Sequence, residues 1–340
     1  MFKSLIGFVI VTLTLILTGC HSTNLQVDTS ESSSYQLPKD MKIALVVDEI
    51  TDKNAFISQS TTKFSDLMDK YSFQGVVVEA GDMDKWESTI AALCEDDYDL
   101  IIGLGWQSGV AMPEYALAYE DISFVAIDAS STSSNVKLYS FDSYSGCYLL
   151  GVMVAQAFPD SDTFGYIGNY EDDANGVYLQ GYKDGIAHVN SSATIITNYI
   201  NSYTDSNLTY TYALRQSAKG ATFIMGSAST EAHEGLFQAA LALSSSESPL
   251  YVSSTSIDQT TSDNPYIIGG VTKNTGIAVE DAILEYISGT LDASEQEVLT
   301  LNSGGFGLVH VNVTANYVNT DIITPDVLLA VGDAYTLLEQ

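Results

Sequence analysis

Apolar runs alternate with amphipathic segments along most of the chain from residue 42 onward. The runs are short, continuous and rich in β-branched residues, and the segments between them repeat apolar positions at helical spacing. Continuous apolar strands that alternate with amphipathic helices are typical of parallel sheets covered by helices on both faces. The predicted strands are 42–47, 73–80, 98–105, 122–129, 163–168, 193–200, 221–226 and 249–254, and the predicted helices are 58–71, 86–96, 110–119, 145–158, 177–189, 208–219, 231–244 and 274–288.

The strand–helix alternation runs twice, once before and once after about residue 142. A chain of 340 residues is also long for one hydrophobic core and suits two domains. We therefore expect an α/β protein with two similar lobes. Small ligands of such sheets bind outside the carboxyl ends of the strands. The loops after the apolar runs carry carboxylates, hydroxyls and aromatic rings, which suits a polar ligand with a flat part.

The N-terminus has the pattern of an export signal. LIGFVIVTLTLIL (5–17) is apolar but shorter than a membrane span, and small residues lead from it to Cys20. The sequence LTGC resembles the bacterial lipobox, which implies a signal peptide over 1–19 and lipid on the Cys20 sulfur. Residues 20–40 are rich in Ser, Thr and Asp and predict a flexible linker. We expect a protein anchored by lipid on the extracytoplasmic face of the cell membrane.

Acidic residues outnumber basic ones by 43 to 12, for a formal net charge of −31. Binding to a phosphate backbone needs a cationic face, so the charge excludes nucleic-acid polymers as partners. Cys94 and Cys147 have no metal-type spacing, and Cys147 lies in an apolar helical run, where a buried thiol is expected. We predict no metal and no cofactor.

Enzyme motifs fail on spacing. GLGWQSG (103–109) has one residue too many for a dinucleotide fingerprint and follows the third predicted strand instead of the first. Two residues separate Gly105 from Ser108, where a nucleophile elbow has one. His233–Glu234 starts like a zincin helix, but Phe237 stands where the second histidine ligand belongs. We predict that the protein is not an enzyme.

Eight stretches carry a family resemblance in chain order: KIALVVDEITDKNAFISQS, DLIIGLGW, VAIDA, FDSYSGCYLLGVMVA, GYIGNYEDDANGVYLQGYKDGI, SSTSIDQ, VTKNTGIAVEDAI and NSGGFGL. Together they resemble the Bmp/PnrA-like family of ABC transporter substrate-binding lipoproteins. The resemblance implies a type I periplasmic-binding-protein-like fold with three hinge crossings. It implies an N-terminal lobe of 41–141 and 274–302, and a C-terminal lobe of 142–273 and 303–340. It further implies a monomer that delivers a nucleoside, a purine nucleoside foremost, to an ABC permease in the membrane.

The resemblance also assigns ligand-binding residues in the first lobe. The family stacks an aromatic ring at Phe56 on a purine, in a loop that holds Asp52 and Asn54; here DKNAF is one residue longer than the family's DKSF. Trp106 stands where the family has a phenylalanine, and its ring can form one wall of a site for a flat ligand. Asp128 ends a predicted strand, where a carboxylate can accept hydrogen bonds from vicinal ribose hydroxyls. The alternative for Phe56 is ordinary packing at a helix start, the alternative for Trp106 is interior packing, and the alternative for Asp128 is capping of a helix or turn.

The remaining candidates follow the later strands. The resemblance implies that Asp258 binds ribose hydroxyls. Lys273 lies in a predicted crossing between the lobes, and the resemblance implies that it bonds the ligand or holds Asp258. The Gly226–Ser227 turn could offer backbone N–H groups to the ligand, and Tyr170 is a candidate second stacking ring. The ordinary alternatives are that Asp258 caps a helix or turn and that Lys273 is a surface lysine. A sugar or autoinducer receptor, or a sensory lipoprotein, on the same fold remains open.

Overall fold

The structure, a computed structural model, describes residues 41–131 and 133–338. The predicted signal peptide, the lipidation residue Cys20 and the linker up to residue 40 lie outside the described residues. In the part that is described, every helix is too short or too polar to cross a lipid bilayer.

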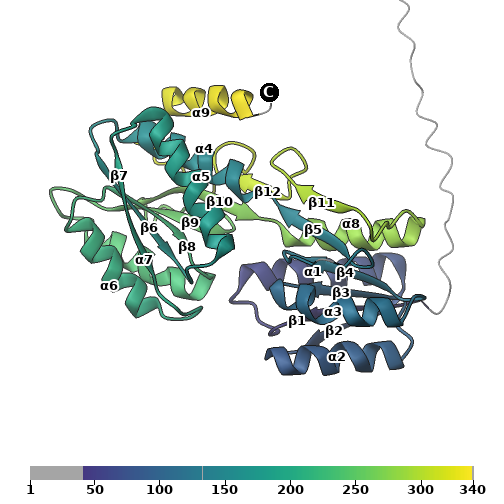
Figure 1. The fold of residues 1–340 in the computed structure, drawn as a ribbon. Helices are drawn as coiled ribbons and strands as arrows, with labels where there is room; N and C mark the ends of the chain where they lie inside the picture. The colour runs from purple at the N-terminus through teal and green to yellow at the C-terminus, as the bar shows by residue number, and fades with distance from the viewer. Residues whose placement is uncertain (1–40, 132, 339–340) are drawn as a thin grey trace, which may run out of the picture. The chain divides into compact units, whose positions relative to one another are not determined.

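The first sheet is parallel throughout (Figure 1). Its strands are β1 (Lys42–Val47), β2 (Gln74–Glu79), β3 (Leu100–Leu104), β4 (Ser123–Ile127), β5 (Lys137–Phe141) and β11 (Gln296–Leu299). Their order is β11-β5-β4-β3-β1-β2. All strands therefore end at one edge, and the loops after β1, β3 and β4 gather there.

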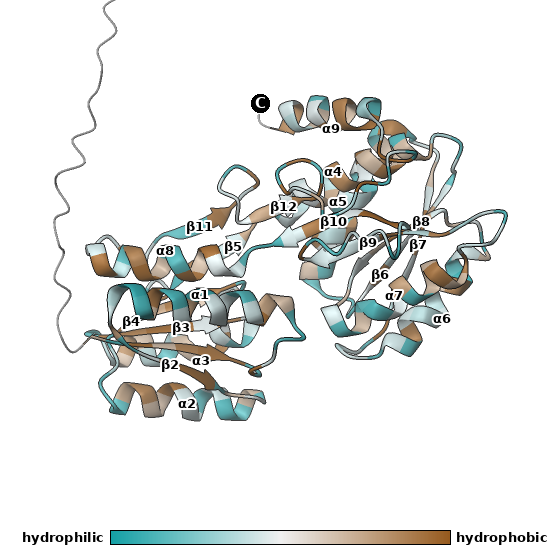
Figure 2. Ribbon diagram, turned by 180° about the vertical axis from the view of Figure 1, so that it is seen from behind, coloured by the Kyte–Doolittle hydropathy of each residue, from teal (hydrophilic) through white to brown (hydrophobic). Residues whose placement is uncertain are grey.

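Four helices cover the two faces of this sheet: α1 (Ala55–Tyr71), α2 (Met83–Glu95), α3 (Trp106–Ala118) and α8 (Thr275–Ser288). Alternate β1 side chains separate the faces, because Ile43, Leu45 and Val47 pack with α1 and α8, whereas Ala44 and Val46 pack with α2 and α3. All five are fully buried. Figure 2 shows these strands in brown between helices of mixed colour, as expected for a sheet that is buried on both sides.

The second sheet repeats the arrangement with one antiparallel edge strand. Its strands are β6 (Thr163–Gly168), β7 (Thr194–Tyr199), β8 (Phe223–Ser227), β9 (Tyr251–Ser256), β10 (Ile267–Lys273) and β12 (Phe306–Leu308), in the order β12-β10-β9-β8-β6-β7. Its helices are α4 (Ser143–Ala157), α5 (Asp173–Val189), α6 (Ser206–Ser217), α7 (Thr230–Ala242) and α9 (Pro325–Leu338).

Glycines let α4 and α5 approach to backbone contact. A Cβ at Gly185 would lie 1.9 Å from the Tyr148 carbonyl oxygen, and one at Gly181 would lie 2.4 Å from the Tyr144 carbonyl oxygen. Neither position can hold a larger residue unless the two helices separate. Cys147 is fully buried on α4, as its apolar surroundings predicted.

The chain crosses between the sheets three times, which completes the predicted fold class: after β5, after β10, and between β11 and β12. The crossings are bonded to one another, because the Asp142 N–H donates to the Leu299 carbonyl at 2.9 Å and the Asn274 N–H donates to the Gly305 carbonyl at 2.8 Å. The predicted α/β fold of two parallel-sheet lobes flanked by helices is confirmed.

Candidate ligand-binding site

The loop after β1 places Phe56 in the first turn of α1. Asn54 caps this helix, since its Oδ1 accepts the Phe56 N–H at 3.1 Å, and Asp52 is exposed just before it. Thr275 donates its hydroxyl to the Phe56 carbonyl at 2.7 Å, and Gln59 donates to the Lys273 carbonyl at 3.2 Å. The turn that carries the half-buried Phe56 ring is thus bonded to the β10–α8 crossing.

Lys273 and Asp128 form an ion pair at this crossing. The Lys273 Nζ donates to both Asp128 carboxylate oxygens at 2.9 Å, and Tyr178 of α5 lies beside the same ammonium group. An ammonium group has three donors, and the Asp128 carboxylate takes two of them. The sequence offered Asp258 as the carboxylate that Lys273 could hold; this was wrong, because β10 ends beside the loop after β4 and the lysine reaches Asp128.

Aromatic rings surround the Lys273 ammonium. Its Nζ lies 5.9 Å from the centroid of Phe56, 5.1 Å from that of Phe141 and 5.5 Å from that of Tyr178. Burial by itself would lower the pKa of Lys273, but Asp128 and Tyr178 more than offset burial and raise the pKa above its ordinary value. The lysine stays charged and can hold the Asp128 carboxylate in place.

Asp128 adopts the left-handed backbone conformation, with φ of 57°. Asn201, after β7, and Ser256, at the end of β9, do the same at 52° and 63°. Non-glycine residues pay for this conformation with strain and are found at functional sites more often than elsewhere. All three stand at the carboxyl ends of parallel strands, where ligands of such sheets bind.

Asp48 is a polar residue of this edge that the sequence did not single out. Its carboxylate accepts the Trp86 indole N–H at 2.9 Å and the Gln107 amide at 2.8 Å. Burial raises the pKa of Asp48, and the two hydrogen bonds partly oppose that rise. Because Gln107 follows Trp106 at the start of α3, Asp48 fixes the helix turn on which Trp106 stands. The available signal was its place directly after a buried strand.

Trp106 is the first residue of α3 and is 54% exposed. The alternative of interior packing therefore does not describe it. A half-exposed indole beside the strand ends can contact a ligand or a partner protein.

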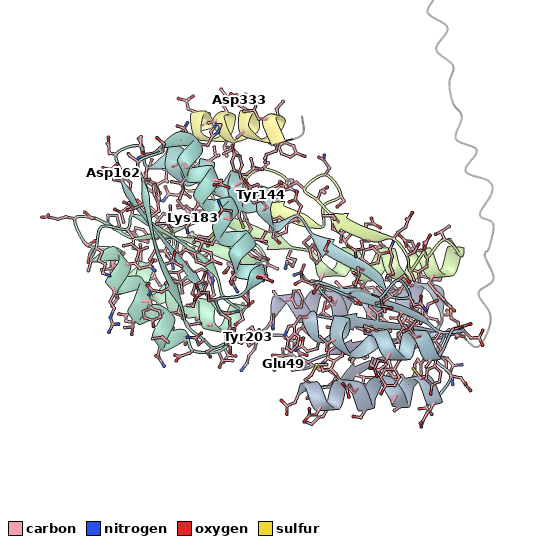
Figure 3. The ribbon with its side chains drawn as sticks, viewed as in Figure 1. Glu49, Tyr144, Asp162, Lys183, Tyr203 and Asp333 are labelled. Atoms are coloured by element: carbon pink, nitrogen blue, oxygen red, sulfur yellow. The ribbon has the colours of Figure 1, made fainter. Side chains whose placement is uncertain are left out.

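Tyr170 and Tyr203 form an aromatic pair on the second sheet's loops. Their ring centroids are 5.0 Å apart, with the planes tilted by 57°, and Tyr203 is 52% exposed. Figure 3 labels Tyr203 on the loop after β7. The Ser229 hydroxyl donates to the Tyr203 carbonyl and so anchors this loop to the start of α7. Tyr203, rather than Tyr170, presents the more accessible ring.

The Gly226–Ser227 turn is engaged within the protein. The Gly226 N–H donates to the Ser253 hydroxyl at 3.0 Å, so the expectation of a free N–H at this residue was wrong. The Ser227 hydroxyl contacts the Tyr166 hydroxyl at 2.5 Å and donates to the Asn175 side chain at 2.6 Å. Ser227 thus belongs to a polar cluster that ties β6 and β8 to the start of α5.

Asp258 orders the loop after β9. One carboxylate oxygen accepts the Thr260 N–H at 3.0 Å, and the other accepts the Asn316 N–H. The carboxylate thus joins two segments that are remote in sequence, and a ligand can reach it only through its remaining lone pairs.

A shallow pocket of about 300 Å³ lies between α1 and the start of α8. None of the predicted ligand residues lines it, and its lining residues are Ser58, Gln59, Thr62, Lys63, Asp66, Asn274 and Gly276. It is therefore separate from the Phe56–Asp128–Lys273 site.

His233, which the sequence analysis compared with a zincin ligand, is fully buried. Its Nε2 lies 2.7 Å from the Ser253 carbonyl oxygen, and its ring would contact any Cβ added at Gly226. It packs α7 against β8 and β9. Residues 41–131 and 133–338 contain no group of three or more His, Cys, Asp or Glu side chains placed to hold a metal ion.

Comparison with known proteins agrees with this architecture over nearly the whole described chain. The family model described as ABC transporter substrate-binding protein PnrA-like (Bmp) matches residues 41–326. Basic membrane protein B of Borrelia garinii subsp. bavariensis is 25% identical over 335 residues, which are 93% of this chain and 94% of that protein. The CD4+ T-cell-stimulating antigen of Listeria innocua is 25% identical over 200 residues, 56% of this chain and 54% of that protein.

Solved structures share the fold at lower identity. An ABC transporter solute-binding protein from Aeropyrum pernix K1 superposes with a TM-score of 0.71 at 18% identity, covering 88% of this chain and 89% of that one. A 5-methylthioribose transporter solute-binding protein from Thermotoga lettingae gives 0.64 at 17% identity, with 87% and 95% covered. The family match extends over both sheets and all three crossings, and the chain therefore belongs to the PnrA-like (Bmp) family of ABC transporter substrate-binding proteins.

Proposed function

We propose that this chain is the lipid-anchored receptor of an ABC importer and binds a nucleoside, with a purine preferred. One observation carries the proposal: the Phe56 ring and the Asp128 carboxylate flank the same buried ammonium group, 5.9 Å and 2.9 Å from the Lys273 Nζ. A flat apolar face next to a fixed carboxylate suits a heterocycle joined to a diol.

The two parts would bind by different forces. Stacking of a base on an aromatic ring contributes about 1–3 kcal/mol, and hydrogen bonds to a charged carboxylate contribute about 1.5–3 kcal/mol each. Lys273 holds Asp128 through two hydrogen bonds, and the remaining lone pairs of Asp128 accept the ribose hydroxyls. Tyr203 and Trp106 are exposed rings that could cover the other face of the base.

The charge of the chain favours a neutral ligand. The formal net charge is −31, and the ammonium of Lys273 is already paired. A nucleotide would bring its phosphate into a negative field, and the Lys273 ammonium beside Phe56 is already held by Asp128. We therefore expect inosine, guanosine or adenosine to bind and their 5′-monophosphates to bind poorly.

Calorimetry on the mature protein tests the ligand class. The panel contains purine and pyrimidine nucleosides, free bases, ribose, D-arabinose, nucleoside monophosphates and amino acids. We expect nucleosides to bind and the base or the sugar alone to bind at least tenfold more weakly, because each lacks one of the two contacts. Binding of a sugar with no binding of any nucleoside would replace this proposal by a sugar receptor.

Substitutions test the site. Phe56→Ala should weaken nucleoside binding at least tenfold, about 1.4 kcal/mol, whereas Phe56→Tyr should retain it because the stacking face remains. Asp258→Ala should weaken binding by a similar factor if the loop it orders contacts the ligand. Unchanged affinity in both alanine variants, with unchanged thermal stability, would show that the ligand binds elsewhere.

Lipid anchoring and import need cell-based measurements. Cys20→Ala should abolish labelling by a radioactive fatty acid and release the protein from the membrane fraction, since acyl chains supply the anchor. Deletion of the gene should lower uptake of radiolabelled nucleoside. Normal uptake in the deletion strain, despite nucleoside binding by the purified protein, would favour the sensory alternative.

A further inference from the structure

Helix α3 carries an apolar stripe on its solvent face. We define the α3 stripe as Trp106, Val110, Pro113 and Leu117, which are spaced four, three and four residues apart and so lie along one side of the helix. Val110 is 58% exposed and Leu117 is 64% exposed, and Pro113 is half-buried. A surface helix normally turns polar side chains in this direction.

The stripe does not serve the packing of the helix. Ala111, Met112 and Ala116 are buried against the first sheet's core on the other face, and Gly109 lies so close to the loop after β4 that a Cβ would be 2.2 Å from the Ser130 carbonyl oxygen. The helix is therefore held by its buried face. An exposed apolar surface that the fold does not require marks an interaction site.

The stripe is continuous with the candidate ligand site. It starts at Trp106, directly before Gln107, which donates to Asp48, and α3 leaves the first sheet at the carboxyl end of β3. Gly109 touches the loop that begins with Asp128. A partner seated on the stripe would thus lie next to the elements that hold the ligand.

Charge around the stripe indicates the chemistry of the partner. Helix α3 contains no Lys or Arg, and its one charged residue, Glu114, flanks the stripe between Val110 and Leu117. A second copy of this chain would bring the same carboxylate, on a protein of formal net charge −31, against this one, whereas a surface that is apolar at its centre and basic at its rim would complement it.

We propose that the α3 stripe is the docking surface for the extracytoplasmic face of the importer's permease, where apolar side chains rimmed by Lys or Arg receive it. This inference rests on the proposed importer role. Truncation or charging of central apolar contacts typically removes most of the affinity of such an interface, while rim contacts contribute little. Ligand binding should not depend on Val110 or Leu117, which lie further along the helix than Trp106.

The test compares two measurements on the same variants. Cells that carry Val110→Asp or Leu117→Asp as the sole copy should import radiolabelled inosine at least tenfold more slowly than wild type, while the purified variants bind inosine with a Kd within twofold of wild type. Leu241→Asp on α7 and Leu329→Asp on α9 are matched controls, because both leucines are exposed, at 46% and 66%, on other helices. The controls should import normally.

Three results would overturn the inference. Equal rates of inosine import in the stripe and control variants would show that the stripe does not dock the permease. Loss of inosine binding in the stripe variants would make it part of the ligand site. A dimer of the wild-type protein in sedimentation that Leu117→Asp dissociates would make a second copy its occupant. Failure of the proposed function is distinguishable, because deletion of the gene would then leave inosine uptake at the wild-type level.

Discussion

Removing the carboxylate of Asp128 should destabilise the protein more than removing the ammonium of Lys273. The Lys273 side chain is only 12% exposed, whereas that of Asp128 is 31% exposed. In Asp128→Asn the lysine stays largely buried among three aromatic rings, with a single amide oxygen in place of the carboxylate. In Lys273→Met the aspartate can turn to water, which compensates much of the lost pairing.

The expected size lies between two known limits. Removing one partner of a fully buried ion pair costs about 3–5 kcal/mol, and an exposed pair contributes about 0.2–1 kcal/mol. This pair is partly buried, so we expect Asp128→Asn to lower the free energy of unfolding by about 2 kcal/mol and Lys273→Met by about 1 kcal/mol. The double variant should lose no more than Asp128→Asn alone, because it leaves no unpaired charge.

Urea denaturation at pH 7 measures the three variants against wild type. The pKa of Lys273 is raised on folding, so its contribution is fully present below the ordinary lysine pKa of about 10.4 and is lost only as the pH rises through the higher folded value. At pH 7 the whole effect is therefore visible. A larger loss in Lys273→Met than in Asp128→Asn, or strict additivity in the double variant, would refute the reasoning.

Three further substitutions test other parts of the structure. Burial lowers the pKa of His233 to about 4, so the free energy of unfolding should fall as the pH drops from about 6.5 toward 4. Denaturation at both pH values should show a smaller fall in His233→Gln than in wild type. The exposed control His188→Gln should show the same fall as wild type. Burial and three neighbouring glutamates raise the pKa of Asp281 to about 6, so the charged carboxylate opposes folding at pH 7. Asp281→Asn should therefore stabilise the protein by about 1 kcal/mol at pH 7 and by less at pH 5. Gly185→Ala should cost about 3 kcal/mol because α4 and α5 must separate, whereas Gly176→Ala on the same helix meets no atom within 4 Å and should be neutral or stabilising; thermal unfolding compares the two.

The strands that could be predicted are those whose apolar pattern is continuous. The run 42–47 coincides with β1, and 163–168 coincides with β6. β5 was missed because it begins with Lys137, a residue that reads as polar but is buried beside Glu285 and Glu297. β11 is an edge strand with exposed positions, and β12 has three residues, so neither gives a pattern long enough to identify.

Helix ends were predicted less well than helix centres. The apolar spacing placed the start of α1 at residue 58 and the start of α3 at residue 110, but they begin at Ala55 and Trp106. The first turn of α1 contains the buried Ala55 and Ile57, but a single turn is too short to show a 3.6-residue period, so periodicity cannot locate the start. Capping locates α1 better, since Asn54 accepts the Phe56 N–H. For α3 the strand–helix turn at Gly105, with φ of 98°, sets the start.

The candidate site shows where sequence reasoning ends. Loops at strand ends could be named in advance, because parallel sheets gather them at one edge. The choice among their charged residues could not, since Lys273 and Asp128 are 145 positions apart and meet only when the crossing after β10 passes the loop after β4. Asp258 looked equivalent to Asp128 in sequence, yet its carboxylate binds two backbone N–H groups. What separates the two aspartates is the presence of a buried cation beside one of them, and that depends on the path of the hinge.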